Sequence, residues 1–588
     1  MLKLYCFIVI LIVQQGRGEA RCAVGCMCSG TIANCSQKGL SVIPSKTLYD
    51  FEVVKLDMSS NKLQSVDNEK LMGYSSLKIL NLANNTIERI DPLAFNGLTQ
   101  LSDLDISKNR ISDIDRRTFV YTPQLKTLLL SENRIIDLEK HVFSSVRVLV
   151  YLDLSTNYLK VITDETFSHN PELEFISLKN NHIQQISDNA FRAQHKLSQL
   201  DLSNNRISIA NCEIFKNLQA LQWLSLAHNK LTTVPINMCH YNQKLMHLYL
   251  SNNNIKYINS GAFSDCTNLV YLSLAHNNIA KLYPHSLHGV FRLEVLDLSS
   301  NDIVSLSPEV FTDYRQQVTT LNASILCSKY SSLNYSLTHL NLENNKINSL
   351  DYCALQPLKH VEVLQLSRNH LSSLDSGLFN NLHNLKRIDI SFNDFKTVED
   401  RLLAVWIKRP DVVAEFAGNP WDCSCDTLYK SYKMLNDNSR EKFTLVCSTP
   451  EEFQGQTWDI LEEGCSPTTV KTSSTTAIFS RFPLIMHDAE IFDEKRMAIE
   501  NANHMDYKMT IRLNETTQNQ TMQIEKYEEE EPVKIRHLGN VIFLSGFACV
   551  VFMSIILIVI RTRYIKKPNV DHLWWEDTIA RKTLFSES

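Results

Sequence analysis

Two groups of four cysteines are the residues in this sequence whose type and spacing could do chemistry. The first group is a C-x3-C-x-C-x6-C cluster and the second opens with a C-x-C pair: Cys22, Cys26, Cys28 and Cys35; Cys423, Cys425, Cys447 and Cys465. Four thiolates can bind a structural zinc ion, and in an oxidising compartment the same four can form two disulfides. The compartment therefore decides between the two interpretations.

The N-terminus indicates an oxidising compartment. Residues 1–20 have the layout of a cleaved secretory signal peptide: Lys3 precedes the apolar run Leu4–Val13, and the small residues Gly18 and Ala20 follow it. Secretion favours disulfides over zinc in both clusters. Four cysteines allow three connectivities, and spacing alone leaves all three open in each cluster.

No catalytic constellation accompanies these cysteines. The sequence has no Gly-rich phosphate loop, no H-E-x-x-H motif and no G-x-S-x-G motif. A formal net charge of −5 gives no bulk electrostatic argument for nucleic acid. We therefore expect a protein that is not an enzyme, uses no cofactor or metal and binds no nucleic acid. The alternative, an ectoenzyme, would be tested by a hydrolase assay.

The element that positions these clusters is a repeat between them. An asparagine recurs every 24 residues from Asn61 to Asn301, and the period resumes at Asn345, Asn369 and Asn393. Each one lies in the frame L-x-x-L-x-L-x-x-N-x-L, and most have a phenylalanine ten residues later. Self-similarity at a fixed period indicates a solenoid, and this frame is that of the leucine-rich repeat.

The frame also predicts how each coil is built. The x-L-x-L-x segment alternates as on a strand, so its leucines point inward and the x positions outward. The asparagines are predicted to form a hydrogen-bonded ladder, and the phenylalanines a second apolar column. About fourteen coils over residues 53–416 would make an α/β-type solenoid, a curved right-handed horseshoe with a concave parallel sheet.

One segment, 312–336, interrupts the period and is either a degenerate coil or a loop that leaves the solenoid. We expect a disulfide between Cys327 and Cys353 to fix it to the next coil. Three more cysteines are 27 residues apart, so either neighbouring pair could form a disulfide: Cys212, Cys239 and Cys266. The leftover cysteine would be a buried free thiol or the site of an intermolecular disulfide. Cys239 replaces the phenylalanine of its coil and should point inward.

The two cysteine clusters flank the repeats, and the second cluster opens with Asn-Pro-Trp-Asp-Cys-Ser-Cys over residues 419–425. In these features the chain resembles the extracellular leucine-rich repeat superfamily with N- and C-terminal cysteine flanks. Toll-like, Slit-like and neuronal adhesion receptors have this architecture. The resemblance covers about residues 22–465 and implies cysteine-rich caps at 21–52 and 417–466. It also implies four disulfides: Cys22–Cys28, Cys26–Cys35, Cys423–Cys447 and Cys425–Cys465.

Residues 538–560 are uncharged, apolar and long enough to cross a bilayer as one helix. Basic residues follow this stretch, so we expect an extracellular N-terminus, a juxtamembrane stalk at 467–537 and a cytoplasmic tail at 561–588. That tail is too short for a Toll-type signalling domain. The expected product is a single-pass type I glycoprotein of the plasma membrane, with N-glycans predicted by sequons at five positions: Asn84, Asn322, Asn334, Asn514 and Asn519.

Aromatic side chains gather on the predicted concave face, in the columns six and four residues before the asparagines. The predicted ligand-binding residues are Tyr151, Phe175, Trp223, His247, Tyr249 and Tyr271. Exposed aromatics on a rigid sheet are costly to solvate and are enriched at interfaces. The alternative is that scattered exposed aromatics are normal. His228 and His276 lie nearby and could serve pH sensing, metal binding or surface polarity.

These features predict a cell-surface recognition protein whose ectodomain binds protein or glycan ligands. An adhesion protein would bind itself or a counter-receptor on another cell. The alternative is an innate-immune or growth-factor co-receptor that signals through a partner subunit, as a dimer or a heteromeric complex. The fold does not name the ligand, because solenoids of this kind host many.

Overall fold

The computed structural model describes residues 22–465, apart from residues 24, 209–210, 236–237, 313–326, 328–332, 410 and 436–442. All described residues lie in the first of two compact units, Met1–Thr475; the second unit, Thr476–Ser588, lies outside them. The predicted signal peptide, stalk, membrane helix and tail also fall outside the described residues. Within those residues, no helix has the length and hydrophobicity that a membrane crossing requires.

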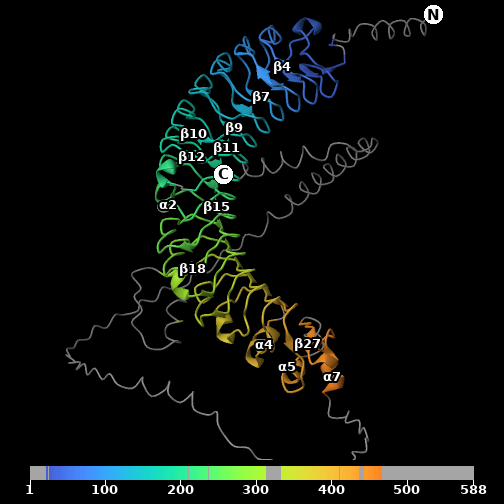
Figure 1. Ribbon diagram of the computed structural model, residues 1–588, viewed down its shortest axis with the longest axis vertical. Helices are drawn as coiled ribbons and strands as arrows, with labels where there is room; N and C mark the ends of the chain where they lie inside the picture. Colours follow the sequence, from blue (N-terminus) through green and yellow to red (C-terminus); the bar gives the residue numbers. More distant parts are fainter. Residues whose placement is uncertain are drawn as a thin grey trace, which may run out of the picture. The chain divides into compact units, whose positions relative to one another are not determined.

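The repeats stack into a curved solenoid whose concave side is a 17-stranded sheet of the described chain (Figure 1). Successive repeat strands pair in parallel, each residue lying opposite the one 24 positions later, as Tyr151 lies opposite Phe175. The exception is the junction where Val295 lies opposite His339. The repeat strands are β3 (Lys55–Asp57), β5 (Ile79–Asn81), β7 (Asp103–Asp105), β8 (Thr127–Leu129), β9 (Tyr151–Asp153), β11 (Phe175–Ser177), β13 (Gln199–Asp201), β14 (Trp223–Ser225), β15 (His247–Tyr249), β17 (Tyr271–Ser273), β19 (Val295–Asp297), β21 (His339–Asn341), β23 (Val363–Gln365) and β24 (Arg387–Asp389).

Strands from outside the repeat frame cover both ends of this sheet. At the N-terminal end, β1 (Met27–Ser29) and β2 (Ile32–Asn34) form an antiparallel hairpin, and β2 pairs in parallel with β3. At the other end, β25 (Val413–Glu415) pairs in parallel with β24. The apolar edges of the first and last coils are therefore not left open to water.

The outer side of the solenoid consists of turns, short strand pairs and single helical turns. The strands pair as β4 (Ser65–Val66) with β6 (Arg89–Ile90), β10 (Val161–Ile162) with β12 (Gln185–Ile186), β16 (Tyr257–Ile258) with β18 (Lys281–Leu282), and β20 (Ser305–Leu306) with β22 (Ser349–Leu350). The helical turns are η1 (Lys46–Leu48), η2 (Cys212–Phe215), α2 (Met238–Tyr241), η3 (Pro308–Phe311) and η4 (Ser376–Phe379).

After the repeats, the chain folds into a small helical and strand layer over the last coil. Its elements are α4 (Asp400–Ile407), β26 (Trp421–Asp422), α5 (Tyr429–Lys433), β27 (Cys447–Thr449), η5 (Glu451–Phe453) and α7 (Ile460–Gly464). Trp406, Trp421 and Trp458 are fully buried in this layer. They give it an apolar interior continuous with that of the repeats.

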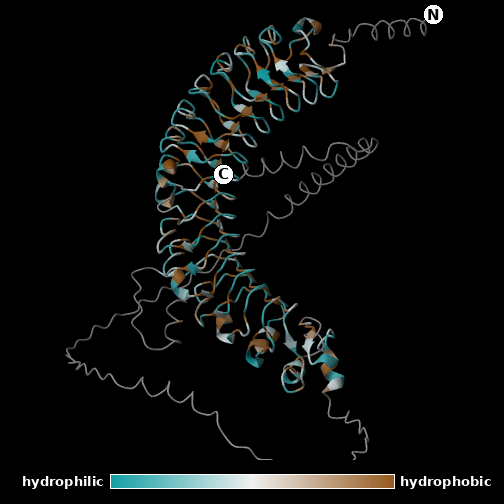
Figure 2. Ribbon diagram, viewed as in Figure 1, coloured by the Kyte–Doolittle hydropathy of each residue, from teal (hydrophilic) through white to brown (hydrophobic). Residues whose placement is uncertain are grey.

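The core is the set of inward columns that the frame predicts. Both strand leucines of a coil, such as Leu152 and Leu154, are inaccessible to water. Behind them the phenylalanines from Phe95 to Phe191 stack ring on ring, with centroids 5.8 Å to 6.3 Å apart. Hydrophobic residues recur in every coil along the stack (Figure 2). The predicted second apolar column is confirmed.

The asparagine ladder is also confirmed. Asn157 Nδ2 donates to the carbonyl of Leu154 in its own coil at 3.1 Å and to that of Leu130 in the preceding coil at 3.0 Å. Its Oδ1 accepts the N–H of Ile135 at 3.0 Å. Asn419, which the sequence analysis placed only in a cap motif, ends the ladder by donating to the Ile390 carbonyl at 3.0 Å.

Most of the interruption at 312–336 lies outside the described residues. Strand β19 pairs directly with β21, Val295 opposite His339, so the intervening segment contributes no strand between them. The ladder crosses the same junction, because Asn345 Oδ1 accepts the N–H of Ile303 at 3.0 Å. Cys327 is disulfide-bonded to Cys353, as expected.

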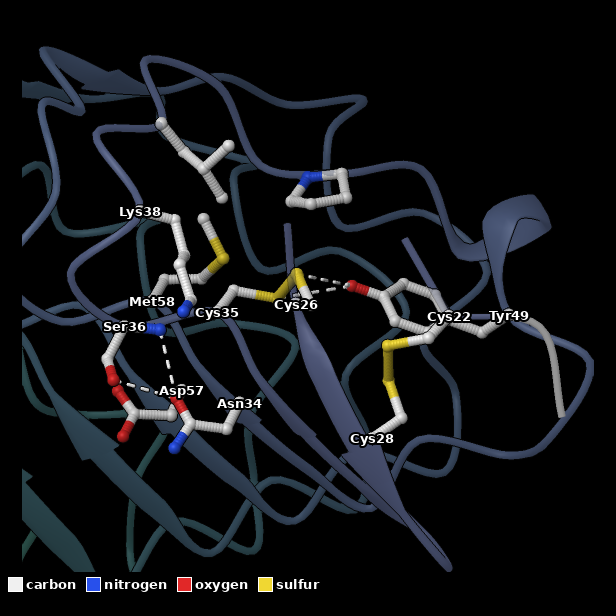
Figure 3. The surroundings of a disulfide bond; sticks show 12 residues. Cys22, Cys26, Cys28, Asn34, Cys35, Ser36, Lys38, Tyr49, Asp57 and Met58 are labelled. Atoms are coloured by element: carbon white, nitrogen blue, oxygen red, sulfur yellow. Dashed lines mark hydrogen bonds between the residues drawn. A yellow bond between two sulfur atoms is a disulfide. The ribbon is translucent and has the colours of Figure 1, made fainter. Parts of the chain in front are cut away.

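The described residues contain six disulfides. Four lie within the two flanks and have the pairings that the resemblance implies: Cys22–Cys28, Cys26–Cys35, Cys423–Cys447 and Cys425–Cys465. In the N-terminal flank the Tyr49 hydroxyl points at the Cys26–Cys35 bond and lies 3.5 Å from the sulfur of Cys35 (Figure 3). No described cluster of histidine, cysteine or acidic residues could hold a metal ion.

The remaining disulfide joins Cys239 to Cys266, the choice that spacing left open. Cys239 is buried, as its place in the phenylalanine column predicts. Cys212 is the leftover free cysteine, and it is half-buried at the start of η2. The expected free thiol is present, but it is half-buried and not buried, because Cys212 lies in an outer turn and not in the core column.

Candidate ligand-binding face

The six predicted ligand-binding side chains all stand on the concave sheet, and all are half-buried. They fall into two groups separated by Gln199, which lies between Phe175 and Trp223 in the strand register. The first group, the aromatic pair, is Tyr151 and Phe175. The second group, the aromatic patch, consists of Trp223, His247, Tyr249 and Tyr271 on strands β14, β15 and β17.

The aromatic pair is a parallel stack. The rings of Tyr151 and Phe175 lie 4.2 Å apart with 2° between their planes. Each ring covers one face of the other, so one outer ring face and the ring edges remain for contact with a ligand.

The aromatic patch is a continuous surface over three strands. Tyr249 lies 5.3 Å from Trp223 and 4.9 Å from Tyr271, centroid to centroid. Its neighbours in the strand register are Ser225 and Ser273, both small and buried. Because these serines leave room at their positions, the Tyr249 ring packs between the two larger rings. His247 stacks on Tyr271 at 6.4 Å.

Packing on the sheet changes how two of these groups ionise. Burial lowers the pKa of His247 below 6.5, and the carboxylate of Glu294 opposes that shift. Burial also raises the pKa of Tyr271 above 10.0, with smaller contributions from Tyr249 and Asp297. At neutral pH the aromatic patch therefore carries no charge of its own.

Carboxylates surround both aromatic groups, a feature that the sequence analysis missed. Five acidic side chains lie on or directly beside strands β9 to β19: Asp153, Glu174, Asp201, Glu294 and Asp297. None of the five is paired with a lysine or arginine among the residues that the structure describes. The aspartates four residues before the ladder asparagines could have indicated an acidic face from the sequence alone. These aspartates also have a structural role, which obscured that indication. Asp153 Oδ1, for example, accepts the N–H of Ser155 at 2.9 Å.

The other two histidines do not belong to the patch. His228 and His276 each directly precede a ladder asparagine and have positive φ angles of 53° and 52°. Every repeat has a residue with left-handed backbone conformation at this position. The two histidines therefore occupy a turn position that is common to all coils. The structure does not bring them together with His247 as a cluster.

Two of the five predicted glycosylation sites, Asn84 and Asn334, lie among the described residues. Asn84 is exposed, and its Nδ2 donates to Ser60 Oγ at 3.0 Å. Asn334 is exposed beside His360. Asn322, Asn514 and Asn519 lie outside the described residues.

Solved structures share this fold at low identity. The structure of the Toll–Spatzle complex from Drosophila aligns over 70% of this chain and 54% of the other, with a TM-score of 0.57 and 23% identity. A leucine-rich repeat protein of Leptospira interrogans aligns over 66% of this chain and 96% of its own, with a TM-score of 0.51 and 22% identity.

Curated relatives match shorter segments. Leucine-rich repeat-containing protein 3 of Mus musculus is 36% identical over 97 residues, which are 16% of this chain and 36% of the relative. A leucine-rich repeat and fibronectin type III domain-containing protein 1-like protein of Danio rerio is 29% identical over 151 residues, 24% of this chain and 21% of the relative. The chain therefore spans only about a fifth to a third of these relatives.

The "Leucine rich repeat" family model matches overlapping segments that run from residue 52 to 322, and a further segment at 359–404. Together these segments cover more than half of the chain. They coincide with the strands and the asparagine ladder described above. The chain belongs to the leucine-rich repeat family.

Proposed function

We propose that this protein is a cell-surface recognition protein, anchored in the plasma membrane by one helix, whose extracellular concave face binds a protein ligand. The observation that carries the proposal is the aromatic patch. The ring of Tyr249 contacts those of Trp223 and Tyr271 on a sheet whose strands are fixed in register by their neighbours. A rigid aromatic surface loses little conformational entropy when a partner covers it, so most of the burial energy remains for binding.

The carboxylates around the patch specify the chemistry of that partner. An aromatic surface bordered by Asp201, Glu294 and Asp297 suits a protein segment that presents lysine or arginine side chains. A guanidinium or ammonium group can lie on the ring of Trp223 and pair with a carboxylate at its edge. Opposite charges across an interface also raise the association rate and exclude acidic competitors.

The Toll–Spatzle structure supports a protein ligand, because it is a complex between a repeat protein of this fold and another protein. Two roles fit the proposal. In adhesion the partner is held on a neighbouring cell, and in the co-receptor role the partner is soluble. The test must separate them.

The test is a cell-mixing assay with the full-length chain. Cells expressing it are mixed with labelled cells that lack it. Clusters of expressing cells alone indicate homophilic adhesion, and mixed clusters indicate a counter-receptor. If adhesion is the function, Trp223→Ala together with Tyr249→Ala should abolish clustering at unchanged surface expression and melting temperature.

The control is Tyr121→Ala together with Tyr257→Ala, two tyrosines that are 38% exposed and lie off the concave strands. This variant should cluster as the wild type does. Clustering that survives loss of the patch would refute the concave site. If the wild type does not cluster, adhesion is refuted, and soluble proteins captured by the wild type but not by the patch variant would indicate a co-receptor.

A further inference from the structure

A second surface of the solenoid has the opposite charge from the concave face. The residue directly after each ladder asparagine is exposed or half-buried along the edge where the concave strands end. Over five consecutive coils this column reads Arg134, Tyr158, His182, Arg206 and Lys230. Lys160, two residues past Tyr158, adds a further cation. We call these six residues the basic ridge.

Backbone hydrogen bonds hold the ridge in a regular row. The N–H of Arg134 donates to the Ile111 carbonyl at 2.8 Å, and the N–H of Tyr158 donates to the Ile135 carbonyl at the same distance. The same bond recurs from His182, Arg206 and Lys230, each to the preceding coil. With coils about 4.8 Å apart, the row from Arg134 to Lys230 is about 19 Å long.

The cations of the ridge are not neutralised by the protein. Within the described residues, Arg134, Lys160, Arg206 and Lys230 make no ion pair. Glu132, two residues before Arg134, is paired with Lys108 at 3.4 Å. Farther along the solenoid the pattern changes, because Lys346 is paired with Asp302 at 2.7 Å. Arg110, one coil before the ridge, is paired with Glu88 at 3.5 Å, so within the described residues the only other unpaired lysine or arginine of this column is Lys62.

A hollow lies at one end of the ridge. Its volume is ≈ 360 Å³, and its lining includes Glu132, Arg134, Thr156, Tyr158, Asn180 and His182. The rings of Tyr158 and His182 meet edge to face at 5.6 Å, and Asn180 Nδ2 donates to Thr156 Oγ1 at 3.3 Å. The lining thus combines a cation, amide and hydroxyl groups and an aromatic face, the groups that bind a sugar ring carrying an anionic substituent. Its one carboxylate, Glu132, is paired with Lys108.

We propose that the basic ridge binds a sulfated polysaccharide, with one sugar unit in the hollow and the sulfates of following units on Lys160, Arg206 and Lys230. A single row of cations one side chain wide fits an extended, regularly charged chain. Six disulfides in the described residues indicate an oxidising compartment, where the polyanions are polysaccharides and not nucleic acids. This site is separate from the concave patch and does not depend on it.

The test is retention of the purified full-length protein on immobilised heparin, eluted with a salt gradient. The wild type should be retained on heparin and not on the same matrix carrying desulfated heparin. The variant Arg134→Gln, Arg206→Gln, Lys230→Gln should bind at least about tenfold more weakly and depend less on salt, since it removes three cations that would pair with sulfates.

The matched control also removes three exposed cations: Lys256→Gln, Lys396→Gln and Arg401→Gln. None of these lies on the ridge, and none makes an ion pair within the described residues. This control should elute with the wild type, as should the Trp223→Ala, Tyr249→Ala variant. Tyr158→Ala should weaken binding without changing its salt dependence, because it removes a ring contact and no charge.

Three outcomes would overturn the proposal. The first is equal retention on sulfated and desulfated heparin, or none on either. The second is wild-type elution of the ridge variant. The third is equal loss by the ridge variant and its control, which would mean that bulk charge and not the ridge governs retention. Melting curves of all variants exclude unfolding as the cause, since every substituted cation is exposed.

Discussion

The side chain of Asn157 forms hydrogen bonds both within its own coil and to the preceding coil. Its amide donates to the carbonyls of Leu130 and Leu154, and its oxygen accepts from Ile135. The side chain is 3% exposed, so water cannot replace it as a partner. The same set of bonds repeats along the stack and ties each coil to the one before it.

Replacing Asn157 with alanine should therefore lower the free energy of unfolding by roughly 3 kcal/mol, since two carbonyls and one N–H lose a partner inside the core. Urea denaturation of the full chain measures this change. Asn278→Ala is the control, because Asn278 is exposed and its side chain bonds to no described group. Equal effects of the two substitutions would show that the ladder contributes little.

His247 gives the concave face a pH dependence. Because burial lowers its pKa below 6.5 in the folded protein, the unfolded chain binds its proton first as the pH falls. Stability should therefore be full above about 6.5 and decline as the pH falls toward the lower, folded pKa. His247→Gln should reduce that decline in a pH series of melting temperatures. An unchanged slope would contradict the shifted pKa.

At the scale of the element, the sequence predicted each coil well but could not choose the disulfide. Cys212, Cys239 and Cys266 are spaced by 27 residues in coils of 24, so each lies three positions further along its coil than the last. Both neighbouring pairs have the same offset, and only the conformation of the outer turns distinguishes them. The structure joins Cys239 to Cys266, both buried, and leaves Cys212 at the outer turn.

Removing that disulfide with Cys239→Ala and Cys266→Ala should cost roughly 3 kcal/mol, because the bond closes a loop with a sequence separation of 27. Thermal unfolding measures the loss, and Cys212→Ala should leave stability unchanged. Alkylation without reduction should modify Cys212 and spare the other two. Modification of Cys239 or Cys266 would mean that the pairing is wrong.

The left-handed turn is the other feature of the coil that periodicity did not reveal. The residue before each ladder asparagine has a positive φ, from 52° at Phe392 to 57° at Arg368. Asparagine tolerates this conformation and occupies the position in several coils, as at Asn84 and Asn180. Lysine, glutamate and phenylalanine also occur there, so residue type alone gave a weak signal.

At the scale of the whole molecule, the sequence predicted the sheet, the ladder and the place of the aromatic residues, because all three follow from a fixed period. It could not predict that Tyr249 packs between Trp223 and Tyr271, since that depends on the small serines on neighbouring strands. Nor did it separate an acidic concave face from a basic edge. Both are columns of single residues in successive coils, and they become surfaces only when the coils are stacked.

The central claim is that the concave face is the contact surface for a protein partner, and a glycan placed on that face tests it most directly. Trp223→Asn creates an N-x-S sequon with Leu224 and Ser225, and Arg116→Asn creates one with Arg117 and Thr118 in an outer turn. A shift in electrophoretic mobility reports whether each glycan is attached.

In the cell-mixing assay, the glycan at position 223 should abolish the clusters that the wild type forms, and the glycan at position 116 should leave them intact. Loss of clusters with the first glycan alone is the result we expect. Clusters that persist with a glycan attached at position 223 would contradict a concave binding face.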